Sequence, residues 1–281
     1  PGAPIREQIV VADLDPRGEP RLLVRRRSGD TIDYLVPAGL CGSPQQAFHD
    51  AVVRYRHMVN DFHDGGVRLT GGDELLTDLA RDSLWLADLT MRGCRPRYGI
   101  GTYNRFKDHS FPPTVLHLGL CLLEWGHFRR AADIISCYLD AYVADDGTFI
   151  YYGPAVSEYG QFLSLCVRYV ELTGDLRWWL RRQSVLRRIW RRLLKLRRES
   201  VDDANAPGGA RGLIPGLPEA DYHGSPEQWR QYYYSGDVWA VRGLTDVARL
   251  LRRSGDAPEA AHIEDEVAGY RSELLASVSA A

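Results

Sequence analysis

The chain has 281 residues, of which 44% are hydrophobic, so it can bury one large core or two medium ones. Its formal net charge of −2 gives no global electrostatic reason to bind nucleic acid or an anionic membrane. No apolar run is long enough to span a bilayer, and no signal peptide is visible. We therefore expect a globular protein with neither nucleic acid nor membrane as a partner.

The first 42 residues have the pattern of β-strands. Runs rich in β-branched residues between positions 5 and 36 are separated by turn signals at 15–18 and 28–30. Three short strands cannot form an independent core. They are expected either to pack on the helices or to form the tail of an upstream β-sandwich.

Residues 43–72 are predicted to form a linker helix. Ser43 and Pro44 are an N-cap and a first-turn proline, and the helical pattern continues to about Phe62. His57, Asp61 and His63 do not share one face of this helix, so the sequence predicts no metal site here and implies no cofactor.

Residues 73–281 have the pattern of repeated α-hairpins, so the fold class is mainly α with a small N-terminal β segment. In each pair an apolar helix ends at a tight glycine turn and a more charged helix follows. The apolar member should be buried on most sides and the charged member on one side. The expected helices cover 73–91, then 113–124 with a partner to 143, 158–172 with a partner to 198, and 237–253 with a partner to 276.

Three long connections, over residues 93–112, 145–157 and 201–235, join these helices. Because each precedes the apolar helix of a pair, we expect all three to emerge at one end of a ring of hairpins. Loops of this length usually carry function. The candidate site residues in or directly after them are Tyr103, Phe106, Lys107 and Asp108 in the first, Tyr152, Glu158, Tyr159 and Gln161 in the second, and Glu219, Asp221, His223, Glu227, Trp229, Tyr233 and Asp237 in the third.

Taken singly, these residues also have structural explanations: Asp108 as a helix N-cap, Glu158 as a first-turn acid, and the tyrosines as packing groups. Taken together, carboxyl groups that move protons and flat rings that stack on sugar faces are what carbohydrate chemistry needs. The sequence therefore predicts a carbohydrate substrate for the loop cluster.

Two further features concern charge and cysteine. The basic stretch 177–198 has apolar residues at helical spacing, which predicts an amphipathic outer helix, with a site for a polyanion or membrane surface as the alternative. The five cysteines include no C-x-x-C pair, and Cys121, Cys137 and Cys166 lie in apolar helical patterns. They are predicted to be buried free thiols, which favours a reducing compartment and a cytoplasmic location.

The order and spacing of several segments resemble those of a known family. The segments are TYNRFKDHSFPPTVLHLGL, DGTFIYYG, GLIPGLPEADYHG and YYYSGDVWAVRGL. From about Asp73 to the C-terminus the chain resembles the six-hairpin α/α-toroid glycosidases, which include the glucoamylases and related bacterial glycoside hydrolases. The resemblance implies glycoside hydrolysis with inversion. Lys107 and Asp108 would hold the sugar at the point of cleavage, Glu219 or Glu227 would be the general acid, and a second carboxylate would activate water.

The chain departs from this family in two ways. Lys107 stands where the family has Arg, which weakens bidentate contact with the sugar. A ring of six hairpins needs about twelve helices, whereas the sequence supplies seven, or eight with the linker helix. A fragment of a longer enzyme, a smaller bundle, or a partner that completes the ring would each explain this difference. Two other functions stay open: a polysaccharide lyase that uses Tyr233 and His223, and a non-catalytic helical module that binds glycan or protein.

Overall fold

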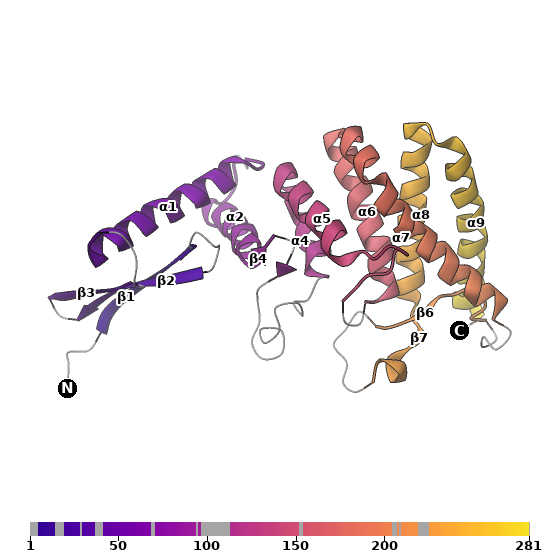
Figure 1. Ribbon diagram of the computed structural model, residues 1–281, viewed down its shortest axis with the longest axis horizontal. Helices are drawn as coiled ribbons and strands as arrows, with labels where there is room; N and C mark the ends of the chain where they lie inside the picture. The colour runs from indigo at the N-terminus through magenta and orange to yellow at the C-terminus, as the bar shows by residue number, and fades with distance from the viewer. Residues whose placement is uncertain are drawn as a thin grey trace. The chain divides into compact units, whose positions relative to one another are not determined.

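The structure is a computed structural model. It describes residues 5–14, 20–28, 30–36, 42–68, 71–93, 95–96, 113–151, 154–203, 207, 209–218 and 225–280. Over these ranges the chain is mainly helical, with eight α-helices and a small N-terminal sheet (Figure 1). This confirms the predicted mainly α class with an N-terminal β segment, and the partial α/α toroid stays a prediction. The chain divides into two compact units, Pro1–Trp85 and Leu86–Ala281. The boundary between the two units, after Trp85, lies inside a helix. The sequence predicts domain boundaries after residues 42 and 72.

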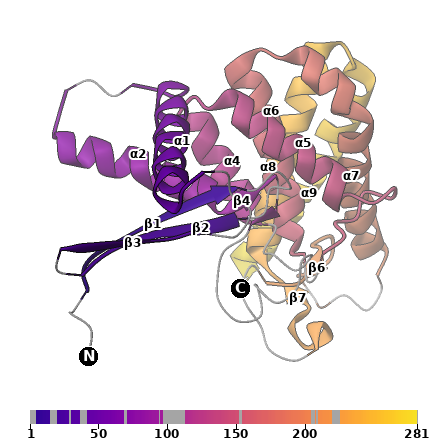
Figure 2. The same cartoon turned by 60° about the vertical axis from the view of Figure 1, so that its left-hand side comes forward.

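The first unit contains an antiparallel sheet covered by a helix. The strands β1 (Ile5–Leu14), β2 (Pro20–Ser28) and β3 (Thr31–Leu35) pair in sequence order. Helix α1 (Pro44–Asp64) begins where predicted, because the Ser43 hydroxyl accepts the Gln46 N–H at 3.2 Å. Its apolar residues Phe48 and Ala51 pack with Leu23 of β2 in a buried cluster. Figure 2 shows α1 beside the sheet. The sheet therefore packs on a helix, which is one of the two predicted arrangements.

Helix α2 (Glu74–Leu89) follows and carries the boundary between the two units. The Asp73 carboxylate accepts the Leu75 N–H at 2.8 Å, so this aspartate caps the helix. Within the first unit, the Trp85 indole donates to the Tyr55 hydroxyl of α1 at 3.3 Å.

The second unit contains three α-hairpins in succession. The described elements are β4 (Met91–Arg92), β5 (Arg95–Pro96), α4 (Thr114–Glu124), α5 (Phe128–Tyr142), α6 (Val156–Thr173), α7 (Leu176–Asp202), β6 (Pro215–Gly216), the 3₁₀ turn η1 (Pro226–Trp229), β7 (Gln231–Tyr232), α8 (Tyr234–Ser254) and α9 (Ala257–Ala280). Helices α6 and α8 end at Gly174 and Gly255, both with positive φ, as the glycine turns predicted. All six hairpin helices are confirmed, with ends that differ from prediction by a few residues.

Helices α6 and α8 are the closest pair in the second unit. A Cβ at Gly160 would overlap the Trp239 carbonyl oxygen, and a Cβ at Gly243 would lie 2.5 Å from the Gly160 oxygen. The two backbones therefore touch, which requires glycine at the crossing. One turn further on, the Ser164 hydroxyl donates to the buried Asp246 carboxylate at 2.9 Å.

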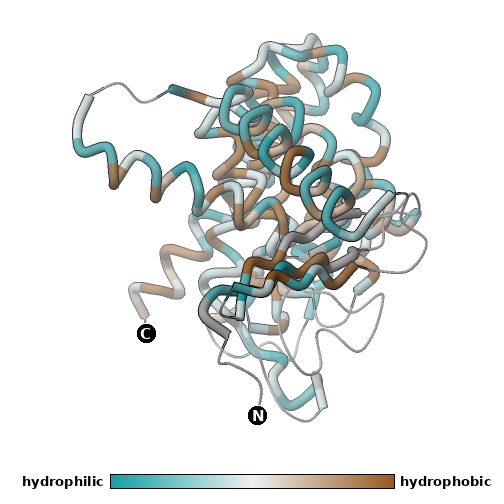
Figure 3. The backbone as a smooth tube through the Cα atoms, turned by 90° about the vertical axis from the view of Figure 1, so that its left-hand side faces the viewer, coloured by the Kyte–Doolittle hydropathy of each residue, from teal (hydrophilic) through white to brown (hydrophobic). Residues whose placement is uncertain are grey.

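Helix α7 is an amphipathic outer helix, as predicted. Trp179 and Trp190 are fully buried on one face. On its basic face, Arg182 pairs with Asp140 of α5 at 2.6 Å, and Arg187 pairs with Asp256 at 3.0 Å. The colour bands along the helices in Figure 3 show the same alternation of hydrophilic and hydrophobic residues. Part of the basic face thus binds the neighbouring hairpins.

The cysteine prediction is correct for one residue and wrong for two. Cys166 is a buried free thiol, and burial raises its pKa well above the usual value. Cys121 is free but exposed, because this face of α4 has no cover among the described residues. Cys137 is disulfide-bonded. A disulfide is typical of oxidising compartments, so the cysteines no longer favour a reducing one. In the described parts of the chain, no helix has the length and apolarity needed to cross a membrane.

Candidate functional site

Two of the three long connections meet at the N-terminal ends of α6 and α8. Strand β6 pairs with β7, with Pro215 opposite Tyr232, and Figure 1 shows both strands at this end of the helices. Gly216 lies directly against Val156, the first residue of α6, and a Cβ at Gly216 would collide with that side chain. A Cβ at Gly236 would lie 3.4 Å from the Val156 Cβ. The described parts of the second and third connections are therefore in contact.

A buried tyrosine cluster lies beneath the second connection. The Tyr138 hydroxyl of α5 donates to the Tyr151 hydroxyl at 3.0 Å, and the Tyr151 hydroxyl donates to the Glu158 carboxylate of α6. The Tyr138 ring also stacks on Phe162, with 4.5 Å between ring centres. This chain of hydrogen bonds holds a buried carboxyl group at the start of α6.

The phenols of this cluster are hydrogen-bond donors and not bases. Burial raises the pKa of Tyr138 well above 10, and the negative charge of Glu158 raises it further. Burial likewise raises the pKa of Tyr151 well above 10, with added contributions from Tyr138 and Glu158. Both hydroxyls therefore keep their protons at neutral pH. The cluster can orient the Glu158 carboxyl group but cannot abstract a proton through its phenols.

Two other predicted residues of the second connection lie on the same helix. The Tyr159 hydroxyl accepts the Phe149 N–H at 3.1 Å, and its ring stacks on Phe149 with 4.2 Å between centres. One face of the Tyr159 ring is thus covered by protein, and the residue is buried. Gln161 is half-buried on α6. The structure gives Tyr159 a packing role, whereas the sequence predicts contact with sugar.

Asp237 is fully buried near the start of α8, where it holds the third connection in place. Its Oδ1 atom accepts the Ile214 N–H at 2.8 Å and the Tyr270 hydroxyl at 2.5 Å. Its Oδ2 atom has no hydrogen-bond partner among the described residues. Burial raises the pKa of Asp237 from 3.8 to about 6, while the two hydrogen bonds act in the opposite direction. Through its bond to the Ile214 N–H, the Asp237 carboxyl group anchors the third connection.

The surroundings of Asp237 extend this anchor to three helices. The Arg197 guanidinium of α7 lies 5.1 Å from the centre of the Tyr270 ring and pairs with Glu266 of α9 at 2.8 Å. The Ser200 hydroxyl of α7 donates to the Leu213 carbonyl. Residues 210–216 are therefore tied to α7, α8 and α9. We call Asp237, Ile214, Tyr270 and Arg197 the Asp237 network.

The more accessible candidates lie on the 3₁₀ turn η1 and directly after it. The Glu227 side chain is exposed and accepts a hydrogen bond from the Ser225 hydroxyl. Trp229 is 40% exposed, and the Tyr233 hydroxyl donates to its carbonyl oxygen at 2.8 Å. An accessible carboxyl group and an accessible indole therefore share one turn of the third connection.

The remaining predicted residues lie outside the described part of the chain. They are Tyr103, Phe106, Lys107, Asp108, Tyr152, Glu219, Asp221 and His223. Within the described part, no group of three His, Cys, Asp or Glu side chains is arranged to hold a metal ion. Sequence reasoning did not select Tyr138, because its place in this cluster depends on the packing of α5 against α6, which has no signal in the local pattern.

Comparison with models of known protein families, with characterised proteins and with solved structures finds no match for this chain. The arguments below therefore rest on the residues and their geometry.

Proposed function

We propose that this chain belongs to a glycoside hydrolase that acts on an oligo- or polysaccharide with inversion, and that its hairpins form part of an α/α toroid. The observation that carries the proposal is the meeting of two connections, rich in aromatic and carboxyl side chains, at the ends of α6 and α8. Gly216 against Val156 and Ile214 bonded to Asp237 define this meeting. Sites built from loops on a rigid helical scaffold are common in enzymes.

The roles follow the chemistry of inverting hydrolysis. Glu219, or Glu227 as the second choice, would protonate the glycosidic oxygen, while a second carboxylate activates water on the opposite face of the sugar. Lys107 and Asp108 would grip the sugar, and the exposed Trp229 ring would stack on it. The proposed roles imply no metal or cofactor.

The buried candidates have a supporting role in this proposal. Glu158 and Tyr159 belong to the tyrosine cluster, which supports the second connection at the start of α6. Asp237 supports the third connection through Ile214. Rigid support of this kind holds catalytic groups within the narrow geometry that a reaction requires.

The decisive variant is Glu219→Gln in the full-length protein. Loss of a general acid should lower turnover about 10²–10⁴-fold, with sugar binding largely kept because the amide preserves shape and hydrogen bonding. A substrate whose leaving group needs no proton, such as a glycosyl fluoride, should recover much of the rate. Turnover is measured on both substrates.

Two matched variants serve as controls. Asp108→Asn should weaken binding, and the activated leaving group should not rescue it, since its role is to grip the sugar. If the activated substrate restores turnover in Glu227→Gln and not in Glu219→Gln, Glu227 is the general acid and the assignment is reversed. Rescue in neither variant would contradict the mechanism.

A non-catalytic helical module is the second candidate. The side chains of Val238, Trp239 and Leu275 are apolar and exposed on α8 and α9, as on surfaces that bind other proteins. Saturable glycan or protein binding without turnover would favour this candidate. Release of an unsaturated, ultraviolet-absorbing product would instead indicate a polysaccharide lyase.

A further inference from the structure

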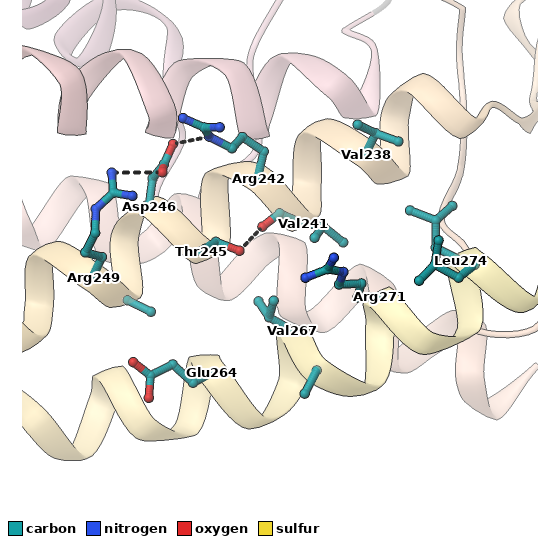
Figure 4. A pocket seen from close by; sticks show the side chains of 13 residues that line it. Val238, Val241, Arg242, Thr245, Asp246, Arg249, Glu264, Val267, Arg271 and Leu274 are labelled. Carbon is teal, nitrogen blue, oxygen red and sulfur yellow. Dashed lines mark hydrogen bonds and ion pairs between the residues drawn. The ribbon is translucent and has the colours of Figure 1, made fainter.

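A groove of about 620 Å³ lies between α8 and α9, and Figure 4 shows the side chains that line it. Its walls include Val238, Val241 and Thr245 from α8, and Val267, Arg271 and Leu275 from α9. Val238 and Leu275 are 52% and 55% exposed, which is unusual for residues on the apolar faces of packed helices. The internal repeat of the chain explains these positions.

The second and third hairpins can be aligned on their turns. Thr173-Gly174-Asp175 and Ser254-Gly255-Asp256 join the helices of the two pairs. Both glycines have positive φ, and each donates its N–H to the carbonyl four residues earlier. From Gly174 to Gly255 is a step of 81 residues, which assigns the residues of α6, and those of α7 from Leu176 to Glu199, equivalents in α8 and α9.

In the repeat, the groove residues of α8 are equivalent to residues of α6 that lie at its contact with α8. Ser157, Gly160 and Ser164 of α6 correspond to Val238, Val241 and Thr245. Gly160 lies against the Trp239 carbonyl, and the Ser164 hydroxyl donates to Asp246. The Ser157 nitrogen would lie 3.8 Å from a Cβ at Gly236. This face is therefore covered in the second hairpin and open in the third.

The groove residues of α9 show the same relation to α7. Leu186, Trp190 and Leu194 of α7 correspond to Val267, Arg271 and Leu275. These three α7 side chains are buried, and the Trp190 indole donates to Glu259 of α9 at 3.0 Å. In the third hairpin the equivalent Arg271 and Leu275 are exposed. The residues on both walls of the groove are thus equivalent to residues with which the α6–α7 hairpin contacts the α8–α9 hairpin.

We propose that this groove is the docking surface for an α-helical hairpin of the α8–α9 type that belongs to a partner protein. The first helix of the occupant would lie along Val238, Val241 and Thr245, as α8 lies along α6. Since Val241 stands where α6 has Gly160, the two backbones would be further apart than those of α6 and α8. The occupant would carry alanine or glycine opposite Val241.

The charges of the groove define the occupant further. Arg242 and Arg249 both pair with Asp246, at 2.8 and 3.0 Å, so their charges are partly neutralised. Arg271 also lies in the groove (Figure 4), and the described residues give it no ion-pair partner. An aspartate or glutamate on the occupant, opposite Arg271, would complete the site.

The test uses the full chain and a fluorescent synthetic hairpin with the sequence of residues 231–280. The probe carries Val238→Arg and Leu275→Arg, so that it cannot receive a second hairpin in its own groove. Fluorescence anisotropy should show saturable binding to the chain. In the chain itself, Val238→Arg or Leu275→Arg should weaken binding at least about tenfold, because a bulky charge then occupies the apolar wall.

The control variant is Leu180→Arg on α7, where the side chain is 57% exposed and lies outside the groove. It should leave probe binding unchanged. All three positions are exposed, so circular dichroism should show wild-type helix content in each variant. Absence of saturable binding, or equal binding by the groove variants and Leu180→Arg, would overturn the proposal. The occupant presents the helix face with which α8 contacts α6, and in a second copy of this chain α6 already covers that face. Self-association of the chain that Val238→Arg abolishes would therefore show a different occupant and overturn the proposal.

Discussion

The most quantitative prediction concerns Asp237, whose carboxyl group is fully buried and bonded to Ile214 and Tyr270. Its pKa is about 6 in the folded chain against 3.8 as the ordinary value. Between these values the folded state binds more protons than the unfolded state, so this group lowers the free energy of unfolding as pH rises. The full effect is about 3 kcal/mol above pH 6, of which roughly 2 kcal/mol falls between pH 4.5 and pH 7.5.

The perturbation is Asp237→Asn, because an amide cannot ionise and its oxygen can still accept both hydrogen bonds. Free energies of unfolding are measured by urea titration of both proteins at pH 4.5 and pH 7.5, with circular dichroism as the signal. The stability of the variant relative to wild type should rise by about 2 kcal/mol from the lower to the higher pH. The other carboxyl groups are the same in both proteins, so their contributions to the pH dependence of stability cancel in this difference. A difference that does not change with pH would refute the reasoning.

The other predictions concern packing and the tyrosine cluster. Gly160→Ala should destabilise the chain by about 1–3 kcal/mol, although alanine favours a helix by about 1 kcal/mol, because the methyl group meets the backbone of α8. Gly269→Ala is its control, since the methyl group there meets only the end of the Arg197 side chain at 3.2 Å. Equal losses of stability in the two variants, measured by urea titration, would contradict the backbone contact between α6 and α8. Tyr151→Phe should cost about 1–3 kcal/mol by removing a donor from a buried carboxylate, and an unchanged midpoint would show that this bond does not stabilise the fold.

The hairpins are predictable from the sequence because their signals are local. Gly174 and Gly255 end α6 and α8, and the apolar and charged members of each pair differ in composition over a few turns. The ends of the helices are less predictable. Helix α8 begins at Tyr234 and not at the expected Asp237, whose side chain bonds to Ile214 and Tyr270 and does not cap the helix.

The roles of buried polar residues are not predictable, since they depend on partners far away in the chain. Asp237 meets Tyr270, 33 residues later, and Trp190 meets Glu259, 69 residues later. No periodic pattern records such pairs. The same reason explains the errors on Cys121 and Cys137, because an apolar helix does not show which of its faces is covered or which thiol has a partner.

The central claim is that the loops at the ends of α6 and α8 form the site of an inverting glycoside hydrolase. The most direct measurement is proton NMR of a panel of oligosaccharides incubated with the full-length protein, followed from the first minutes so that the anomer released first is observed. The account predicts cleavage of a member of the panel with inversion at the anomeric carbon, and its loss in Glu219→Gln. Cleavage with retention, or cleavage that Glu219→Gln and Glu227→Gln leave unchanged, would contradict the account.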